Sequence, residues 1–574
     1  MAGTTLTSRI PSEPSVDASA AEAESPAQRD LWIFRDGQQL VSGPAMVREL
    51  ASRLSACMNN DQCLLDALIQ AGQLEAALAD ANSLDAPRAS QLTDVLATAV
   101  CSGTANVAQA SSLLAQILPP DQIKISPPEG FTYYALHPLD FARIICRIPD
   151  EPQICALIGI RSIGTTLSAT CAAALKNAGR LVSRITVRPT GHPYSRQTEF
   201  TLQQIRWIAD QLAMRAQFLI VDEGPGRSGS TFLSVAEALI QAGVPRKKIT
   251  ILGSRQPDPE SLCANEAPAR WRVFRFIPTV PGANSRFENC IYIGGGNWRN
   301  FIFSDVADWP EGWTQMERLK FLSPEGKSFF KFEGMGSHGA EVRERAFVLA
   351  DAGFSPRVIG TDAGFLEYER LHGRALRIQD LNSSLLKKIA QYCAFRVSAF
   401  PAPSSAPAQL AEMLEFNLRQ EFGWEFSVPE GSFATSTPVF ADGRMQPYEW
   451  IAQSNGAIVK TDAISHGDDH FFPGPGDVAW DLAGTAIEWQ LDPQARDYLL
   501  SHFQRLTGRN LSVRFPLYML AYAIFRMGFC KMAISTVRGS EEELRLQSAY
   551  ARYRSLVATL FEHLNRSDRL TPAA

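Results

Sequence analysis

The chain has 574 residues, with 55 Lys and Arg against 60 Asp and Glu, which gives a formal net charge of −5. Hydrophobic residues make up 45% and charged residues 20% of the chain, a composition that excludes a fibrous or disordered protein. The nearly neutral charge also argues against a strongly basic nucleic-acid-binding protein. At roughly 150 residues per domain, the length predicts about three or four domains.

The first 30 residues are rich in Ala, Ser, Glu and Pro and lack an apolar run behind a basic start, so we expect a disordered N-terminus (1–30) and no secretory signal. The most apolar later stretch, 515–525, ends at Arg526, short of the ~20 residues that span a bilayer. The ten cysteines are scattered without a Cys-x-x-Cys pair, which favours reduced, mostly buried thiols over a metal site or a disulfide framework. We therefore expect a cytoplasmic protein that acts on small molecules, with no nucleic-acid or membrane partner; its oligomeric state stays open.

Helical apolar spacing with short polar breaks predicts a helical domain at 31–125. Pro-Pro pairs at 119–120 and 127–128 then indicate a linker. From there to about residue 300, short apolar runs alternate with amphipathic stretches, which predicts βαβ units and a mostly parallel sheet. We expect strands at 155–160, 183–187, 218–221 and 249–252, and helices at 167–178, 202–214 and 231–242.

The fold class predicted for the whole chain is multidomain α/β and α+β. The α/β domain is expected at 126–300, and the sequence pattern changes near its end: a triple glycine at 294–296 is more typical of a flexible junction than of a phosphate-binding loop. The runs 318–322 and 328–332 predict a β-hairpin, followed by a helix from about residue 340.

The run 218–232 carries the strongest chemical signal. A four-residue apolar strand precedes two adjacent carboxylates, Asp222 and Glu223, and a turn rich in Gly and hydroxyl residues opens the next helix. Converging backbone N–H groups, hydroxyl donors and the positive end of the helix dipole predict a phosphate site. The carboxylates suit sugar hydroxyls and Mg²⁺. The alternative is an ordinary strand–turn–helix of an α/β domain.

These residues resemble the PRPP-binding loop of type I phosphoribosyltransferases, although the loop is one residue longer here. The earlier run RSIGTT at 161–166 resembles the pyrophosphate loop of that family, and Arg188, His192, Tyr194 and Arg196 fall where the family has a mobile loop. The resemblance covers about residues 131–280. It implies a Mg²⁺-dependent, phosphoribosyltransferase-like (PRTase-like) domain with Asp222 and Glu223 as catalytic residues. The residues that it implies for PRPP binding are Arg161, Ser162, Gly164, Thr165, Gly224, Gly226, Arg227, Ser228, Gly229, Ser230 and Thr231.

The C-terminal part resembles, more loosely, the aminoglycoside-phosphotransferase-like branch of the kinase fold, with an N-lobe at 301–374 and a C-lobe at 375–570. In this resemblance Lys331 is the phosphate-contacting lysine, and Glu341 or Glu344 is its ion-pair partner. The run FLEYERLHG at 365–373 resembles the hinge that takes adenine. The implied ATP-binding residues are Lys331, Glu344 and Glu367.

Two further runs follow in the order that this kinase resemblance requires. DGRMQPYEW at 442–450 resembles a catalytic loop that begins at Asp442, and Asp462 resembles the metal-binding aspartate, with GDVAWDLA at 476–483 behind it. The family's metal-binding Asn falls on Pro447, so Glu449 or Asn455 would have to replace it as a ligand. Phosphoryl transfer depends mainly on positioning and charge neutralisation, which such residues provide.

One other cluster invites a different interpretation. His466, Asp468 and His470 lie close together in the sequence and could bind a metal, but a polar loop of this kind is usually solvated.

The sequence thus predicts a bifunctional Mg²⁺-dependent enzyme that uses PRPP and ATP as co-substrates in nucleotide-like or secondary metabolism. One alternative is a binding protein that senses PRPP or a nucleotide and has a degenerate kinase-like lobe. Another is a kinase alone, whose first domain supplies substrate specificity. The acceptor and the order of the two activities are not readable from the sequence.

Overall fold

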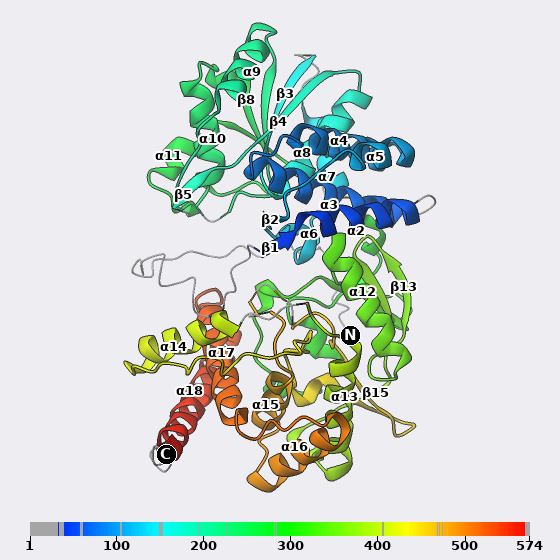
Figure 1. Ribbon diagram of the computed structural model, residues 1–574, viewed down its shortest axis with the longest axis vertical. Helices are drawn as coiled ribbons and strands as arrows, with labels where there is room; N and C mark the ends of the chain where they lie inside the picture. Colours follow the sequence, from blue (N-terminus) through cyan, green and yellow to red (C-terminus); the bar gives the residue numbers. More distant parts are fainter. Residues whose placement is uncertain are drawn as a thin grey trace, which may run out of the picture.

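The structure, a computed structural model, describes residues 33, 39–57, 61–103, 106–148, 153–192, 194–226, 228–280, 282, 284–403, 407–467, 469, 471–472 and 474–568. Figure 1 shows a parallel sheet with its helices at one end of the long axis and a larger assembly at the other. We call these the N-terminal half (39–282) and the C-terminal half (284–568). The disordered N-terminus expected at 1–30 lies outside the described residues.

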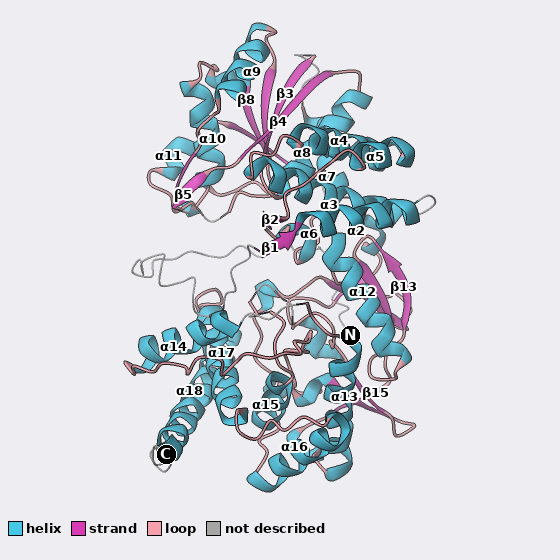
Figure 2. Ribbon diagram, in the orientation of Figure 1, coloured by secondary structure: helices cyan, strands magenta, loops and turns pink. Residues whose placement is uncertain are grey.

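The N-terminal half is built on a five-stranded parallel sheet with the strand order β4-β3-β7-β8-β9 (Figure 2). Alternate residues of a strand face opposite sides, so Leu157 and Leu219 pack towards α8, while Ile158 and Ile220 pack towards α9 and α10. The strands and helices predicted between 155 and 252 are therefore confirmed. Their bounds are β3 Ile154–Ile160, α8 Ile163–Asn177, β4 Leu181–Val187, α9 Leu202–Ala213, β7 Gln217–Val221, α10 Ser230–Gln241, β8 Ile249–Gly253, α11 Ala267–Trp271 and β9 Arg275–Pro278.

Four N-terminal helices cover the α8 face of this sheet. Ala169 and Ala173 of α8 belong to the same apolar core as the helices. Arg184 of β4 adds a buried ionic tie: its guanidinium lies 2.9 Å from Glu75 Oε1 and 2.8 Å from Asp94 Oδ1. The helices are α2 Gly43–Ala56, α3 Asp61–Asp80, α4 Ala86–Ser102 and α5 Val107–Leu114, with the antiparallel pair β1 Gln39–Ser42 and β2 Gln122–Ile125 beside them.

Shorter elements complete the N-terminal half. Helices α6 (Glu129–Thr132) and α7 (Pro138–Ala142) follow β2, and the hairpin of β5 (Thr190–His192) and β6 (Ser195–Gln197) follows β4.

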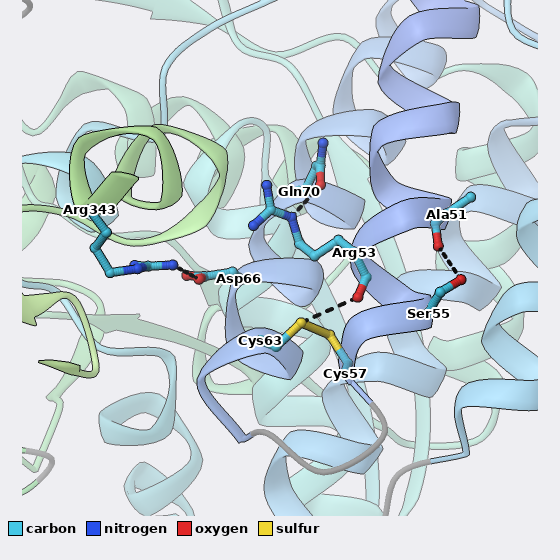
Figure 3. The surroundings of a disulfide bond; sticks show 8 residues. All are labelled: Ala51, Arg53, Ser55, Cys57, Cys63, Asp66, Gln70 and Arg343. Atoms are coloured by element: carbon cyan, nitrogen blue, oxygen red, sulfur yellow. Dashed lines mark hydrogen bonds and ion pairs between the residues drawn. A yellow bond between two sulfur atoms is a disulfide. The ribbon is translucent and has the colours of Figure 1, made fainter. Parts of the chain in front are cut away.

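A disulfide between Cys57 and Cys63 joins the end of α2 to the beginning of α3 (Figure 3). The expectation of reduced thiols is therefore wrong for this pair, because the end of α2 and the beginning of α3 bring two cysteines six positions apart within bonding reach. The other eight cysteines form no disulfide in the described part of the chain, and five of them are buried.

Three residues beyond Cys63, Asp66 links α3 to the C-terminal half. Its Oδ1 accepts the backbone N–H of Gly336 at 2.7 Å, and its other oxygen pairs with Arg343 (Figure 3). Both partners belong to α12 (Gly336–Asp351). Burial raises the pKa of Asp66, and the nearby Arg343 opposes that rise. The two halves are thus joined by a buried charged contact as well as by the chain.

The C-terminal half begins with a five-stranded antiparallel sheet in the order β10-β11-β12-β14-β13. The predicted hairpin is confirmed as β11–β12. A second sheet has the order β15-β16-β17. The helices of this half share a large apolar core with the antiparallel sheet, which contributes Val358, Leu366 and Tyr368. The remaining bounds are β10 Ile291–Tyr292, β11 Lys320–Leu322, β12 Ser328–Phe332, β13 Val358–Asp362, β14 Phe365–Glu369, β15 Gly373–Ala375, α13 Ser383–Ala399, α14 Pro407–Phe422, β16 Trp450–Gln453, β17 Ile458–Lys460, α15 Ala479–Glu488, α16 Pro493–Thr507, α17 Phe515–Ile534 and α18 Glu541–Asp568.

Helix α17 is longer than its sequence suggested. It runs through Arg526 for 20 residues, and by length and composition alone it could cross a membrane. However, 78% of its most apolar window is buried inside the protein. Arg526 lies within reach of Glu488 and Glu311, as expected of a helix in the centre of a folded core.

Candidate active site

A cavity of about 360 Å³ lies between the antiparallel sheet and the loops around β16 and β17. We call it the Lys331 cavity. Apolar side chains from the sheet line one part of it, including Ile293, Leu322 and Phe329. Charged side chains converge on another part: Lys320, Lys331, Glu333, Glu449 and Asp462. A pocket with apolar walls and a few convergent charges is typical of a small-molecule site.

Lys331 is the centre of these charges. Phe329 and Lys331 are two residues apart on β12 and therefore face the same side of the strand. The Lys331 Nζ lies 2.7 Å from Ser465 Oγ and 3.0 Å from Glu333 Oε1, and it pairs with Asp462 Oδ1. Burial would raise the pKa of Asp462, but the ammonium groups of Lys320 and Lys331 hold it well below its usual range. Asp462 is therefore an anion that faces the cavity.

The loop that begins at Asp442 is held in place by hydrogen bonds to helix α15. Asp481 of α15 accepts the backbone N–H of Asp442 at 2.9 Å and that of Gly443 at 3.0 Å. The carboxylate of Asp442 accepts the N–H of Arg444 at 3.1 Å on one oxygen and the Tyr392 hydroxyl on the other. Asp442 is fully buried and is not among the residues that line the cavity. Asp442, the residue predicted to be catalytic, thus orders its own loop from a buried position and does not reach the cavity wall.

Lys460 joins Asp442 to Glu449. Its Nζ lies 3.1 Å from Asp442 Oδ2 and 2.9 Å from Glu449 Oε2. Glu449 ends a short turn that begins at Pro447, and this turn brings its side chain to the cavity wall. Burial raises the pKa of Glu449 to about 7, although Lys460 opposes the rise.

Three side chains at this point have the spacing of a cation site. One ligand atom each from Asp442, Glu449 and His466 lies within 4.8 Å of the others. His466 Nε2 also lies 3.6 Å from Asp462 Oδ2. Asp462 and Glu449, the two predicted metal ligands, both line the cavity. Carboxylate oxygens are the donors that Mg²⁺ prefers, so the side chains of Asp462 and Glu449 fit the ion.

The structure corrects three expectations about this site. Glu344 is exposed on α12 and does not line the cavity, because α12 turns Val342, Ala346 and Leu349 to the core instead. Glu333, only two residues after Lys331, is the glutamate that pairs with the lysine.

Glu367 also lies outside the cavity wall and accepts the Ser328 hydroxyl at 2.5 Å across the sheet. Asn455 is an exposed turn residue that accepts the N–H of Ala457. Of the two candidates to replace the family's Asn, only Glu449 reaches the cavity. Asp468 and His470 of the alternative metal cluster lie outside the described residues.

The sequence argument also missed several charged residues of the cavity. Lys320 lies opposite Lys331 on the neighbouring strand, and Lys460 stands two residues before Asp462. The two-residue period of a strand could have placed Glu333 on the side of Lys331. No local pattern signals the long-range pairing of Lys460 with Asp442.

The second candidate site lies at the carboxyl edge of the parallel sheet, where the loops after β3 and β7 meet. A Cβ atom on Gly164 would approach the carbonyl oxygen of Val221 to 2.4 Å, so only glycine permits this contact. Asp222 follows β7, and its Oδ1 accepts the N–H of Glu223 at 2.9 Å. Burial raises the pKa of Asp222 to about 7. We call this the Asp222 edge.

The predicted phosphate turn at the Asp222 edge opens α10. Gly229 has a φ of +66°, the left-handed conformation that favours glycine, and it caps the helix. The hydroxyls of Ser228 and Ser230 lie 2.9 Å apart just before the first turn, and Thr231 is half-buried in that turn. Gly224 precedes the turn and Gly226 is exposed within it. Arg227 lies outside the described residues.

The loop after β3 is tied to the helical layer. Ser162 caps α8 and Thr165 is buried in its first turn. The Arg161 guanidinium lies 2.9 Å from Asp80 Oδ1, and Arg188 pairs with the same carboxylate at 2.6 Å. Both arginines thus share one carboxylate of α3, which offsets one of their two positive charges.

No protein-family model matches this sequence, and no curated protein does. Solved structures of small-molecule phosphotransferases resemble about 43% of the chain. The choline kinase LicA from Streptococcus pneumoniae is 16% identical with a TM-score of 0.31 over 43% of this chain and 91% of its own. Aminoglycoside 2'-phosphotransferase-IIIa is 12% identical with a TM-score of 0.30 over 42% and 89%.

A third solved structure, macrolide 2'-phosphotransferase MphH from Brachybacterium faecium, is 12% identical with a TM-score of 0.27 over 41% of this chain and 87% of its own. At such scores a likeness does not by itself establish a function.

Proposed function

We propose that the C-terminal half is a Mg²⁺-dependent phosphotransferase that moves a phosphoryl group from ATP to a hydroxyl of a small molecule. The observation that supports this most directly is the pairing of Lys331 with Asp462 in the wall of one cavity. Phosphoryl transfer needs a cation on the phosphates and carboxylates that can hold a metal. Lys331 and Asp462 offer both functions at one point.

The rest of the cavity suits the same reaction. The apolar wall at Ile293, Leu322 and Phe329 offers a surface for a planar base. Asp462 and Glu449 would hold Mg²⁺, which neutralises phosphate charge when bound. Asp481 keeps the Asp442 loop in place through two backbone N–H groups. The reaction depends on positioning more than on a strong base, so a loop held this rigidly is what it requires.

The test is turnover of Mg-ATP by the full chain with a panel of amino alcohols, aminoglycosides and nucleosides, followed by ADP release. We expect Lys331→Met and Asp462→Asn each to lower kcat/KM at least 100-fold. Lys387→Met, at an exposed position on α13, is the matched control and should leave turnover unchanged. Full activity in Lys331→Met, or no binding of ATP by the wild-type chain, would contradict the proposal.

A second activity is supported by the Asp222 edge. We propose that the N-terminal half binds PRPP and acts as a phosphoribosyltransferase, with the turn at Ser228–Ser230 on the sugar phosphate. The close contact of Gly164 with Val221 supports this, because it brings the loops after β3 and β7 to one edge of the sheet. Asp222 and Glu223 would accept hydroxyls of the ribose or hold Mg²⁺.

Incubation with PRPP, Mg²⁺ and a panel of bases, with pyrophosphate release as the readout, tests this second activity. The double variant Asp222→Asn, Glu223→Gln should abolish it. If PRPP instead raises the melting temperature without being consumed, the domain is a PRPP sensor. If PRPP has neither effect while ATP is turned over, the protein is a kinase alone. Activity at both sites would make it bifunctional, with PRPP and ATP used in nucleotide-like or secondary metabolism.

A further inference from the structure

Lys320 and Lys331 form a pair of like charges across two neighbouring strands. Lys320 of β11 lies directly opposite Lys331 of β12 in the antiparallel register, and both side chains line the Lys331 cavity. The Lys320 side chain is only 13% exposed and that of Lys331 only 5%. Like charges directly opposite each other destabilise a sheet, and burial of a charge adds to that cost. Such a pair is therefore stable only where anions compensate both ammonium groups.

Two carboxylates compensate these charges, but the two lysines do not share them equally. Lys331 Nζ lies 3.0 Å from Glu333 Oε1 and also pairs with Asp462 Oδ1. Lys320 Nζ lies 3.3 Å from Asp462 Oδ2. Within the described part of the chain, Asp462 is the only ion-pair partner of Lys320. Lys331 thus has a second anion to rely on, and Lys320 has none.

Glu317, three residues before Lys320, does not fill this gap, because both of its oxygens accept other hydrogen bonds. Glu317 Oε1 accepts the indole N–H of Trp298 at 2.7 Å, and Oε2 accepts the backbone N–H of Gly296 at 2.9 Å. The charge of Lys320 is therefore compensated by Asp462 alone.

The proposed function gives Asp462 a second task, that of a Mg²⁺ ligand. A divalent ion at this carboxylate would lie close to both ammonium groups, and like charges at such a distance repel each other. Binding of the ion therefore requires both ammonium groups to move away from Asp462. Lys331 then still has Glu333, whereas Lys320 needs a new anion. Mg²⁺ binds to proteins together with substrate phosphates, so phosphate oxygens of the nucleotide arrive with the ion.

We propose that Lys320 is a second phosphate-binding residue of the cavity, whose ammonium passes from Asp462 to a phosphate oxygen of the nucleotide when Asp462 takes the metal ion. This inference rests on the proposed phosphotransferase function and adds Lys320 to Lys331 as a cation on the phosphates. The exchange leaves no charge uncompensated, because each ammonium group has an anion before and after it. The nucleotide is thus held by lysines from both strands of the β11–β12 hairpin.

The test compares a ligand that carries phosphates with one that does not. Binding of ATP and of adenosine to the full chain, both in the presence of Mg²⁺, is measured by isothermal titration calorimetry. In Lys320→Met, Mg-ATP should bind about 10-fold more weakly or worse, and adenosine should change by less than about twofold, because only the phosphates lose a charged hydrogen bond. Lys320→Arg keeps the charge and should stay within about threefold of the wild type for both ligands.

Two further variants control the experiment. Lys327→Met, at an exposed position in the turn between β11 and β12, should leave both affinities unchanged. Lys320→Met leaves Asp462 paired with Lys331, so we expect it to fold, and its melting temperature checks this. If it does not fold, Lys320→Gln takes its place. This neutral variant can still donate to Asp462, and it should weaken Mg-ATP binding about 10-fold where Lys320→Arg does not.

Wild-type affinity for Mg-ATP in a folded Lys320→Met or Lys320→Gln chain would overturn the inference and leave the phosphotransferase function intact. An equal loss of affinity for Mg-ATP and adenosine would also overturn it, because Lys320 would then be only a structural partner of Asp462. Failure of the wild-type chain to bind Mg-ATP would instead overturn the phosphotransferase function, and this inference with it.

Discussion

The carboxylate of Asp481 lies 2.9 Å from the backbone nitrogen of Asp442, thirty-nine residues earlier in the chain, and both residues are fully buried. The second oxygen of Asp481 accepts the next N–H, that of Gly443, at 3.0 Å. A carboxylate that accepts two adjacent backbone N–H groups fixes the direction of the loop. The Asp442 loop is therefore held in place by α15.

We expect Asp481→Asn to destabilise the protein and to lower kcat for phosphoryl transfer. An amide can accept only one of the two N–H groups with its oxygen, and its NH₂ group opposes the other. The free energy of unfolding in urea should fall by about 1–3 kcal/mol. Asp497→Asn, at an exposed position on α16, should change it by less than ~0.5 kcal/mol. Equal effects of the two variants would contradict the role of Asp481.

Asp222→Asn should make the stability of the protein less dependent on pH. Burial raises the pKa of Asp222 from 3.8 to about 7, so between these values the folded state binds a proton that the unfolded state has released. Wild-type stability therefore falls as pH rises from about 4 to about 7 and is level above that range. The variant has no carboxyl group at this position, so its stability does not fall with pH for this reason.

The measurement is the free energy of unfolding of both chains at pH 5 and pH 8 without ligands. The advantage of Asp222→Asn should grow with pH, and because Asp222 keeps part of its surface exposed, roughly 4 kcal/mol is the upper limit. An advantage that stays constant with pH would show that folding leaves the pKa of Asp222 unchanged, and one that shrinks would show that folding lowers it; either result would contradict the raised pKa.

Glu75→Ala tests whether the N-terminal helices fold as one unit with the parallel sheet. The variant leaves Arg184 buried with only Asp94 as an ionic partner, so we expect a loss on the order of 3 kcal/mol in the free energy of unfolding. Glu49→Ala removes a Glu–Arg pair at the surface of α2 and should cost less than ~1 kcal/mol. Separate unfolding transitions for helices and sheet would contradict a common unit.

Reduction of the Cys57–Cys63 disulfide should lower stability modestly. The bridge closes a loop with a sequence separation of 6, for which restriction of the unfolded chain contributes about 2 kcal/mol. Titration of the unfolded protein should find eight thiols without reductant and ten with it. Ten thiols under both conditions would exclude the bridge.

Sequence periodicity predicted the βαβ region well, because the strands from β3 to β8 are buried apolar runs and the helices between them are amphipathic. It also predicted the β11–β12 hairpin, whereas Lys331 and Asp462 were assigned to one site by the resemblance to the kinase fold. It could not predict Glu333 as the partner of Lys331, because the choice between that residue and Glu344 depends on how α12 is rotated against the sheet. Contacts between residues far apart in sequence, such as Lys460 with Asp442, leave no local pattern.

The Cys57–Cys63 bridge was missed for a related reason. Cysteine spacing shows a disulfide only when a recurring motif is present, whereas here the proximity comes from how the end of α2 and the beginning of α3 lie beside each other. The pairing of Arg161 and Arg188 with Asp80 could not be predicted either, because the helical layer that carries Asp80 was treated as a separate domain.

The contact of Asp66 with Gly336 and Arg343 bears on how this protein can be divided for study. A fragment that begins after the linker at 119–128 would lose Asp66, and the first turn of α12 would then lose its acceptor and Arg343 its counter-charge. Helix α12 directly follows the strand that carries Lys331. Expression of the C-terminal half alone would therefore yield a chain in which the strand that lines the Lys331 cavity is missing a support that lies more than 250 residues away in the sequence.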